Sequence, residues 1–134
     1  MPMKIDRIDP ASLAPPTGYC HVAVVSAGRQ VHVSGQIALD AMGKVVGEGD
    51  VAAQAEQVYA NLAAGLAAAG ADFSKVFKTV TYVVELTPEK VAAVRKVRAK
   101  YLGEGPYPAS TMVGVTALVD PRLLIEIELV AALD

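Results

Sequence analysis

The chain has 134 residues, 53% of them hydrophobic, and a formal net charge of −2. This length suits a single domain, residues 1–134, with one hydrophobic core, and the weak negative charge leaves no electrostatic footprint for nucleic acid. A membrane span is not expected either, because the uncharged run at 57–71 contains Asn61 and two glycines and is shorter than the roughly 18 apolar residues that a span needs.

The first part of the chain predicts strands on both sides of an extended loop. A short strand is expected at 4–8, and residues 9–18 form the loop because they include three prolines and a glycine. Runs of β-branched residues then predict strands at 21–25 and 30–34. Gly28 lies in the short connection between them, which predicts that these two strands form a hairpin.

Two amphipathic helices follow. Between residues 51 and 69, apolar side chains recur at three- and four-residue steps, and Gly70 provides a C-terminal stop. The second helix is expected at 88–102, where a threonine precedes a proline at the first helical position. Gly103 ends this helix.

Three further strands are predicted at 76–85, 111–118 and 123–131, and the last two are expected to pair as a hairpin joined at Asp120–Pro121. The element order is therefore β-β-α-β-α-β-β, with the short strand at 4–8 in front. This order predicts a fold with both helices and strands, α/β in the broad sense and α+β in arrangement. Two helices pack on one face of a mostly antiparallel or mixed sheet. The other face of the sheet needs cover, and the high hydrophobic fraction predicts that another copy of the chain provides it.

The last strand places two carboxylates on the face away from the helices. Side chains alternate along a strand, so Glu126 and Glu128 point to one face, and the isoleucines and leucines that alternate with them point to the other. A partly buried carboxylate is costly unless it is paired, protonated or used. Two interpretations stay open, a solvated or salt-bridged pair and a functional site.

The chain resembles the RidA (YjgF) family through four segments that occur in the family's order and cover nearly the whole sequence. These segments are Val33-Ser-Gly-Gln36, Asn61-Leu62 ahead of the Ala67–Gly70 stop, Tyr107-Pro-Ala109, and Ile125-Glu-Ile-Glu128. The resemblance implies a chorismate-mutase-like homotrimer with a barrel-like centre and clefts between subunits. It also implies hydrolysis of reactive enamines and imines to carbonyl products and ammonia, with no cofactor.

The same resemblance proposes the site residues. Glu126 matches the glutamate that positions the attacking water, a role that suits a carboxylate. Tyr19 is similar to the tyrosine that borders the family's cleft, and Gly35 matches the glycine where ligand approaches the backbone. Ser110 and Thr111 complete the substrate-binding candidates, and here the chain departs from the pattern, because the deaminating members have arginine where Ser110 stands.

The missing arginine argues against 2-aminoacrylate as the substrate. A guanidinium pairs with a carboxylate through two parallel hydrogen bonds, whereas serine offers one neutral donor. Arg95, in the second helix, is the candidate replacement, and with it a carboxylate-bearing ligand still fits the cleft. The alternative is that Arg95 belongs to an ordinary solvated face with the other cations of this helix, Lys90, Lys96, Arg98 and Lys100.

Other signals set the expected partners. No metal site is predicted, because His21 and His32 could approach each other across the hairpin but have no third ligand at metal spacing. A lone cysteine, Cys20, and a charged N-terminus without an apolar leader favour the cytoplasm. Two functions stay open: RidA-like hydrolysis of an imine or enamine other than 2-aminoacrylate, and non-catalytic binding of a small metabolite in the same cleft. The expected partners are a small-molecule ligand and two further copies of the chain, with neither nucleic acid nor a membrane.

Overall fold

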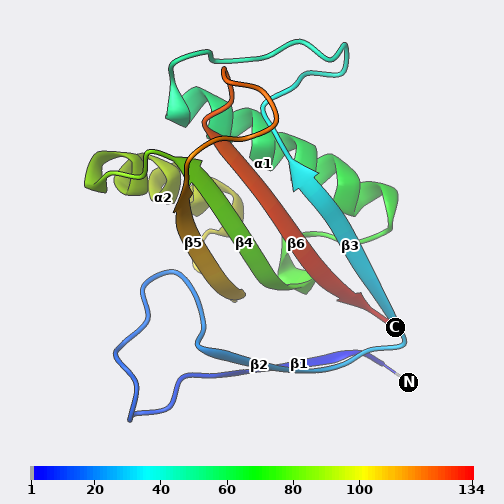
Figure 1. Cartoon of the computed structure of the whole chain (residues 1–134). Helices are drawn as coiled ribbons and strands as arrows, with labels where there is room; N and C mark the ends of the chain where they lie inside the picture. Colours follow the sequence, from blue (N-terminus) through cyan, green and yellow to red (C-terminus); the bar gives the residue numbers. More distant parts are fainter. Residues whose placement is uncertain (1) are drawn as a thin grey trace.

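The computed structural model describes residues 2–134 (Figure 1). The short strand expected at 4–8 is confirmed, as are both helices. In chain order the elements are β1 (Lys4–Ile8), β2 (Val22–Ser26), β3 (Arg29–Gln36), α1 (Val51–Ala68), η1 (Phe73–Lys75), β4 (Val76–Val84), α2 (Pro88–Leu102), β5 (Ala109–Val115) and β6 (Ile125–Leu133).

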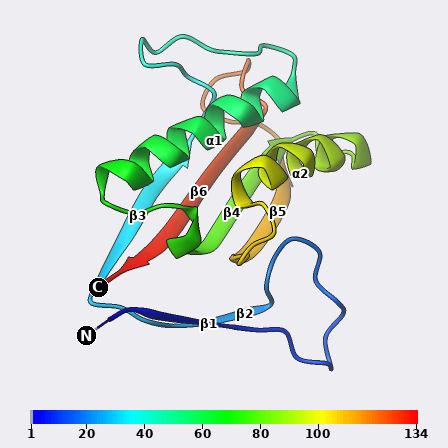
Figure 2. The same cartoon turned by 180° about the vertical axis from the view of Figure 1, so that it is seen from behind.

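The main sheet has four strands in the order β3-β6-β4-β5, and β1 and β2 form a separate antiparallel ribbon (Figure 1). β6 runs antiparallel to both of its neighbours, while β4 and β5 are parallel because α2 connects them as a crossover. Both helices lie on the same face of the main sheet (Figure 2). The predicted mixed sheet with two helices on one face is therefore confirmed.

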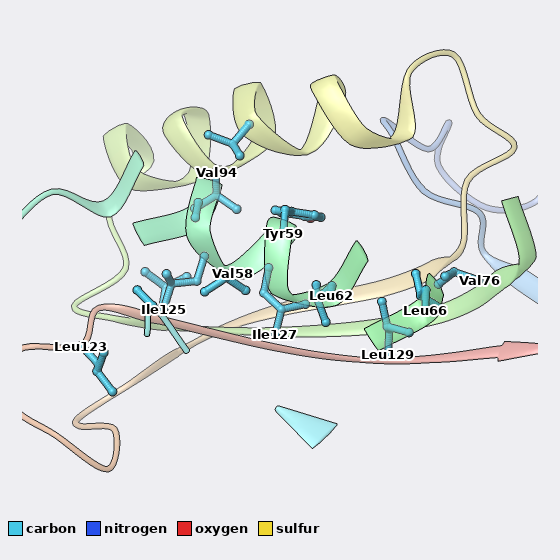
Figure 3. Packing of buried hydrophobic residues seen from close by; sticks show 14 of the residues in the cluster. Val58, Tyr59, Leu62, Leu66, Val76, Val94, Leu123, Ile125, Ile127 and Leu129 are labelled. Atoms are coloured by element: carbon cyan, nitrogen blue, oxygen red, sulfur yellow. The ribbon is translucent and has the colours of Figure 1, made fainter. Parts of the chain in front are cut away.

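The core lies between α1 and β6. Leu62 and Leu66 of α1 face Ile125, Ile127 and Leu129 of β6, and none of these five side chains is more than 2% exposed (Figure 3). Burying each such side chain contributes roughly 1.5–3 kcal/mol. The predicted alternation along β6 is confirmed, since the intervening side chains are only partly buried on the opposite face.

Local signals explain where the helices begin. The Asp50 side chain accepts a hydrogen bond from the Ala53 amide at 3.1 Å, and the Thr87 hydroxyl accepts one from the Lys90 amide at 3.2 Å. Each cap satisfies an amide that has no partner within the helix. α2 ends at Gly103, whose φ of +57° favours glycine.

The predicted hairpin between residues 21–25 and 30–34 is wrong. β2 pairs with β1, and β3 pairs with β6 in the main sheet. The reason lies in packing, because pairing with β6 brings Val31 and Val33 against the core beneath α1. β2 instead leaves Val22 and Val24 exposed.

The predicted direct pairing of the last two strands is also wrong. β5 ends at Val115, and β4 lies between β5 and β6. A β-α-β crossover makes its two strands parallel neighbours, so α2 places β5 beside β4 and leaves β6 to pair with the other edge of β4.

The face of the main sheet away from the helices carries valines together with polar side chains, which include Lys78 and Thr111 besides the two glutamates. Val80 and Val84 of β4 and Val130 of β6 are partly buried there, and Val113 of the edge strand β5 is 39% exposed.

No helix within residues 2–134 has both the length and the apolar character required to cross a bilayer.

Candidate functional site

A pocket of about 240 Å³ opens between β5 and α2. Three residues proposed from the sequence line it, namely Tyr19, Arg95 and Ser110. Arg98 also lines it, although the sequence suggested Arg98 only as part of a solvated face. The pocket is lined by Tyr19, Leu86, Val91, Arg95, Arg98, Ser110 and Met112. Their side chains give it apolar walls with cations and hydroxyls between them.

Ser110 reaches this pocket because of its register in the sheet. It pairs with Thr79 of β4, whose side chain faces the helices, and the Thr79 hydroxyl donates to the Ser110 oxygen at 2.9 Å. Thr111, the next residue, points to the opposite face and is exposed. Ser110 and Thr111 therefore do not line one pocket within a single chain.

Tyr19 is held beside β5 by the backbone of the residue that follows it. The Cys20 amide donates to the carbonyl of Pro108 at 2.9 Å, and Cys20 forms an isolated parallel bridge with Ala109. The Tyr19 ring then contacts the ring of His21 edge to face, with centroids 5.3 Å apart. The loop before β2 thus places an aromatic hydroxyl at the pocket.

The two arginines of the pocket differ in exposure. Arg95 is exposed, whereas Arg98 is partly buried, and neither forms an ion pair with any residue in 2–134. Burial lowers the pKa of Arg98 below its ordinary value, and the positive charge of Arg95 acts in the same direction. Their spacing of three residues on a helix puts both side chains on one face, a signal that would have identified Arg98 from the sequence.

Gly18 makes room for the Arg98 side chain. A Cβ on Gly18 would lie 2.5 Å from Arg98 Nη2, and the φ of Gly18 is +71°. Both the close approach and the left-handed backbone favour glycine at this position. The loop before Tyr19 therefore closes over the guanidinium.

Gly35 and Glu126 meet on the other face of the sheet. The β3–β6 ladder shifts register between Val33 and Gln36, which brings the Gly35 backbone against the Glu126 side chain. A Cβ on Gly35 would overlap Glu126 Oε2 and would lie 2.8 Å from the carboxyl carbon. Only glycine leaves the carboxylate in its observed place.

Glu128, the neighbouring carboxylate of β6, differs from Glu126 because it accepts a hydrogen bond. The Tyr82 hydroxyl donates to Glu128 Oε1 at 2.6 Å, and this hydrogen bond raises the pKa of Tyr82. Glu126 makes no ion pair and no side-chain hydrogen bond within residues 2–134. Of the two partly buried glutamates of β6, Glu126 is thus the one with its oxygens available.

A second hollow, of about 460 Å³, lies beside Gly35. Asn61 of α1 borders it and donates to the carbonyls of Ile37 and Leu39, at 3.1 and 3.0 Å. The asparagine of the Asn61-Leu62 segment therefore fixes the chain that leaves β3, immediately after Gly35.

The histidines show no metal chemistry. Nε2 of His21 lies 2.6 Å from the Ala14 carbonyl, and that of His32 lies 2.9 Å from the Gln30 side chain. The hypothesis that they face each other was wrong, because β2 and β3 belong to different sheets. The described part of the chain, residues 2–134, contains no group of three His, Cys, Asp or Glu side chains that could hold a metal ion.

Within one chain the proposed residues therefore fall into two groups. Tyr19, Arg95 and Ser110 line the pocket on the helix side of β5. Gly35 and Glu126 lie together near the far edge of the sheet, on its opposite face. A single copy of the chain does not bring the two groups together.

Comparison with known proteins finds relatives along nearly the whole chain. The family model described as Endoribonuclease L-PSP matches residues 10–133. A RutC family protein of Synechocystis is 37% identical over an alignment of 135 positions, which covers 99% of this chain and 98% of that protein. The 2-iminobutanoate/2-iminopropanoate deaminase of Rattus norvegicus is 32% identical over 127 residues, 95% of this chain and 90% of the deaminase.

A solved structure is similar along the whole length. The Yersinia pestis protein YyfB, described as a protein of unknown function of the conserved Rid family, has 40% sequence identity and a TM-score of 0.88. The match covers 99% of this chain and 100% of that one. The chain thus belongs to the RidA/YjgF family, the endoribonuclease L-PSP family of the matching model.

Proposed function

We propose that this protein hydrolyses a reactive imine or enamine metabolite to a carbonyl product and ammonia, with Glu126 as the residue that orients the attacking water. The observation that carries this proposal is the state of the Glu126 carboxylate. It is partly buried, it has no ion pair within residues 2–134, and it faces the bare backbone of Gly35. Because no residue in 2–134 occupies its oxygens, this carboxylate is free to bind and orient a water molecule.

The chemistry needs a proton acceptor and no electron transfer. Water adds through its oxygen to the carbon of the C=N bond while Glu126 accepts the proton that water loses. The carboxyl group then returns that proton to the nitrogen, which gives a carbinolamine. It next carries the proton of the new hydroxyl group to the same nitrogen, so that the C–N bond breaks as the C=O bond forms and ammonia leaves with both protons of the water. An enamine first takes a proton at carbon to become the imine.

The two groups of residues require a neighbouring copy of the chain. We place the cleft between subunits of a homotrimer, where the pocket with Tyr19 and Ser110 from one copy meets Gly35 and Glu126 from the next. The valines on the face of the main sheet away from the helices, including the exposed Val113, support this assembly because apolar side chains left at the surface favour a protein contact.

Substrate binding in this cleft uses donors that replace the family's arginine. Arg95 lies in the same pocket as Ser110 and supplies a guanidinium for a substrate carboxylate. Ser110 offers its hydroxyl, and the backbone at Gly35 and Thr111 contributes further hydrogen bonds. The substrate is then a 2-imino acid held differently from 2-aminoacrylate in other members.

The test is ammonia release from freshly generated 2-aminoacrylate and 2-iminobutyrate, and from larger imines, by the wild type, Glu126→Gln and Glu128→Gln. Glu126→Gln is expected to lower turnover by about 100-fold or more, since it removes the charge that accepts the proton. Glu128→Gln is the matched control, because it removes a charge on the same strand and the same face. Light scattering checks that all three proteins keep the same mass, and equal turnover in the two variants would refute the role of Glu126.

Ser110 favours one second candidate function, the non-catalytic binding of a small metabolite in the same cleft. Without an arginine on β5, the chain lacks the bidentate clamp that holds a carboxylate next to the reacting carbon. If no imine is hydrolysed faster than it decays spontaneously while a carboxylate still binds, the binding function is the correct one.

A further inference from the structure

The pocket between β5 and α2 holds two guanidinium groups and no acid. Arg95 and Arg98 lie one helical turn apart, and the other lining residues are hydroxyl-bearing or apolar. Neither arginine forms an ion pair with another residue in 2–134. We refer to this site, the pocket lined by Arg95 and Arg98, as the two-arginine pocket.

The other arginines within residues 2–134 have partners. Arg7, which is also partly buried, donates to the carbonyls of Tyr107 at 2.9 Å and Val76 at 3.1 Å. Arg122 pairs with Asp120 at 2.8 Å. The guanidinium of Arg98, in contrast, donates none of the side-chain hydrogen bonds formed within residues 2–134.

An unsatisfied, partly buried guanidinium is costly, because it loses water contacts without gaining acceptors. The backbone at Gly18 lies close to the Arg98 guanidinium, and Arg95 adds a second positive charge close enough to affect it. A single carboxylate occupies one guanidinium fork and leaves the other unpaired. Two anionic groups satisfy both forks and cancel the repulsion between them.

We propose that the two-arginine pocket binds a ligand with two carboxylates, and that the substrate is the 2-imino derivative of a dicarboxylic amino acid. The second part rests on the hydrolysis proposed above. Water would add to the C=N carbon, the C–N bond would break, and the products would be a 2-oxo dicarboxylic acid and ammonia. A pocket of about 240 Å³ accommodates a ligand of a few carbon atoms.

The pocket is tested without catalysis, by calorimetric titration with succinate and with butyrate, which share a four-carbon skeleton but differ by one carboxylate. The proteins are the wild type, Arg95→Gln, Arg98→Gln, Arg98→Lys and Lys96→Gln. Lys96→Gln is the matched control, because Lys96 is an exposed cation of the same helix that does not line the pocket. Unfolding by urea checks that each variant is folded.

Succinate is expected to bind at least about tenfold more tightly than butyrate, as one additional charge-assisted hydrogen-bonded pair is worth this much. Arg95→Gln and Arg98→Gln should each lose about tenfold in succinate affinity and little in butyrate affinity, and Lys96→Gln should match the wild type. Arg98→Lys should fall between, since it keeps the charge but loses the fork.

Equal affinity for succinate and butyrate, or an equal effect of all three glutamine variants, would overturn the proposal. Tighter binding of inorganic phosphate than of succinate would also overturn it, because the site would then be a phosphate site.

A second assay separates this proposal from the hydrolysis. Imines are generated in place by an amino acid oxidase, from aspartate and from alanine, and ammonia release is measured above the spontaneous rate. Preference for the aspartate imine by about tenfold or more in kcat/KM supports the proposed substrate. Equal rates for both imines reject the dicarboxylic substrate but keep the hydrolysis. Tight succinate binding with no hydrolysis of either imine rejects the hydrolysis and the substrate, and keeps only the dicarboxylate pocket.

Discussion

The Glu126 carboxyl carbon lies where a Cβ on Gly35 would be only 2.8 Å away. Gly35 of β3 and Glu126 of β6 meet where the register of these two strands shifts, so the absence of a side chain on Gly35 determines where the Glu126 side chain points. The water-orienting role proposed for Glu126 needs this kind of fixed position.

Replacing Gly35 with alanine is expected to displace the Glu126 side chain and to lower turnover together with stability. Overpacking of this size costs about 1–3 kcal/mol in the free energy of unfolding. In the double variant Gly35→Ala, Glu126→Ala the stability cost should disappear, because the overlapping atoms are gone. Urea unfolding of the two single variants and the double variant measures the coupling, and additive effects would contradict it.

Arg98→Met should leave the free energy of unfolding unchanged or higher. Methionine keeps the apolar stem contacts and removes a buried charge that has no acceptor. Arg7→Met serves as the comparison, because it removes hydrogen bonds to Tyr107 and Val76 and should cost about 1–3 kcal/mol. Equal losses in the two variants would mean that Arg98 has structural partners after all.

Gln54→Leu is expected to destabilise the fold by about 2–3 kcal/mol although the new side chain is apolar and similar in size. The side-chain nitrogen of the buried Gln54 donates to the backbone carbonyls of Arg122 and Gly47, and its side-chain oxygen accepts from the Leu124 amide at 2.7 Å. These bonds tie α1 to the start of β6. Gln30→Leu, at an exposed position, should change stability by less than about 0.5 kcal/mol in the same urea experiment.

Alkaline pH should destabilise the protein through Tyr59. Burial raises the pKa of Tyr59 from 10.0 to about 12. Below pH 10 both states keep the proton and the contribution is complete; between pH 10 and about 12 the unfolded state loses the proton first, so the unfolding free energy falls as pH rises. Tyr59→Phe should lose less stability over this range, by roughly 3 kcal/mol, and an identical pH profile would contradict the assignment.

The helices were predictable because their signals are local. The start and stop signals of α2 lie at its two ends, at Thr87-Pro88 and at Gly103. The apolar residues whose spacing predicted α1 include Val58, Leu62 and Leu66, which are buried in the core. Side-chain alternation in β6 was equally local, which is why the two faces of that strand were assigned correctly.

Strand partners were not predictable in the same way, since alternation says which face is buried but not which strand lies alongside. The short connection before Arg29 suggested a hairpin, yet β3 pairs with a strand about 100 residues later in the chain. A crossover helix between β4 and β5 was visible in the sequence, and it would have indicated parallel neighbours.

The candidate site was predictable residue by residue but not as an arrangement. The sequence resemblance named Tyr19, Ser110 and Glu126, and it contained no information on which face of the sheet each would occupy relative to the others. Arg98 was passed over because five cations on one helix resemble a solvated surface. Its distinguishing feature, partial burial without a partner, exists only in three dimensions.

The separation of Ser110 and Glu126 by the thickness of a sheet has a genetic consequence. If each cleft takes its glutamate from one subunit and its arginine from the next, two impaired variants can complement one another. Refolding Glu126→Gln together with Arg98→Gln in equal amounts would then restore roughly a quarter of the clefts, since random assembly pairs two intact halves at that frequency. Two defective genes expressed in one cell would yield a working enzyme, whereas a site confined to one chain would give no recovery at all.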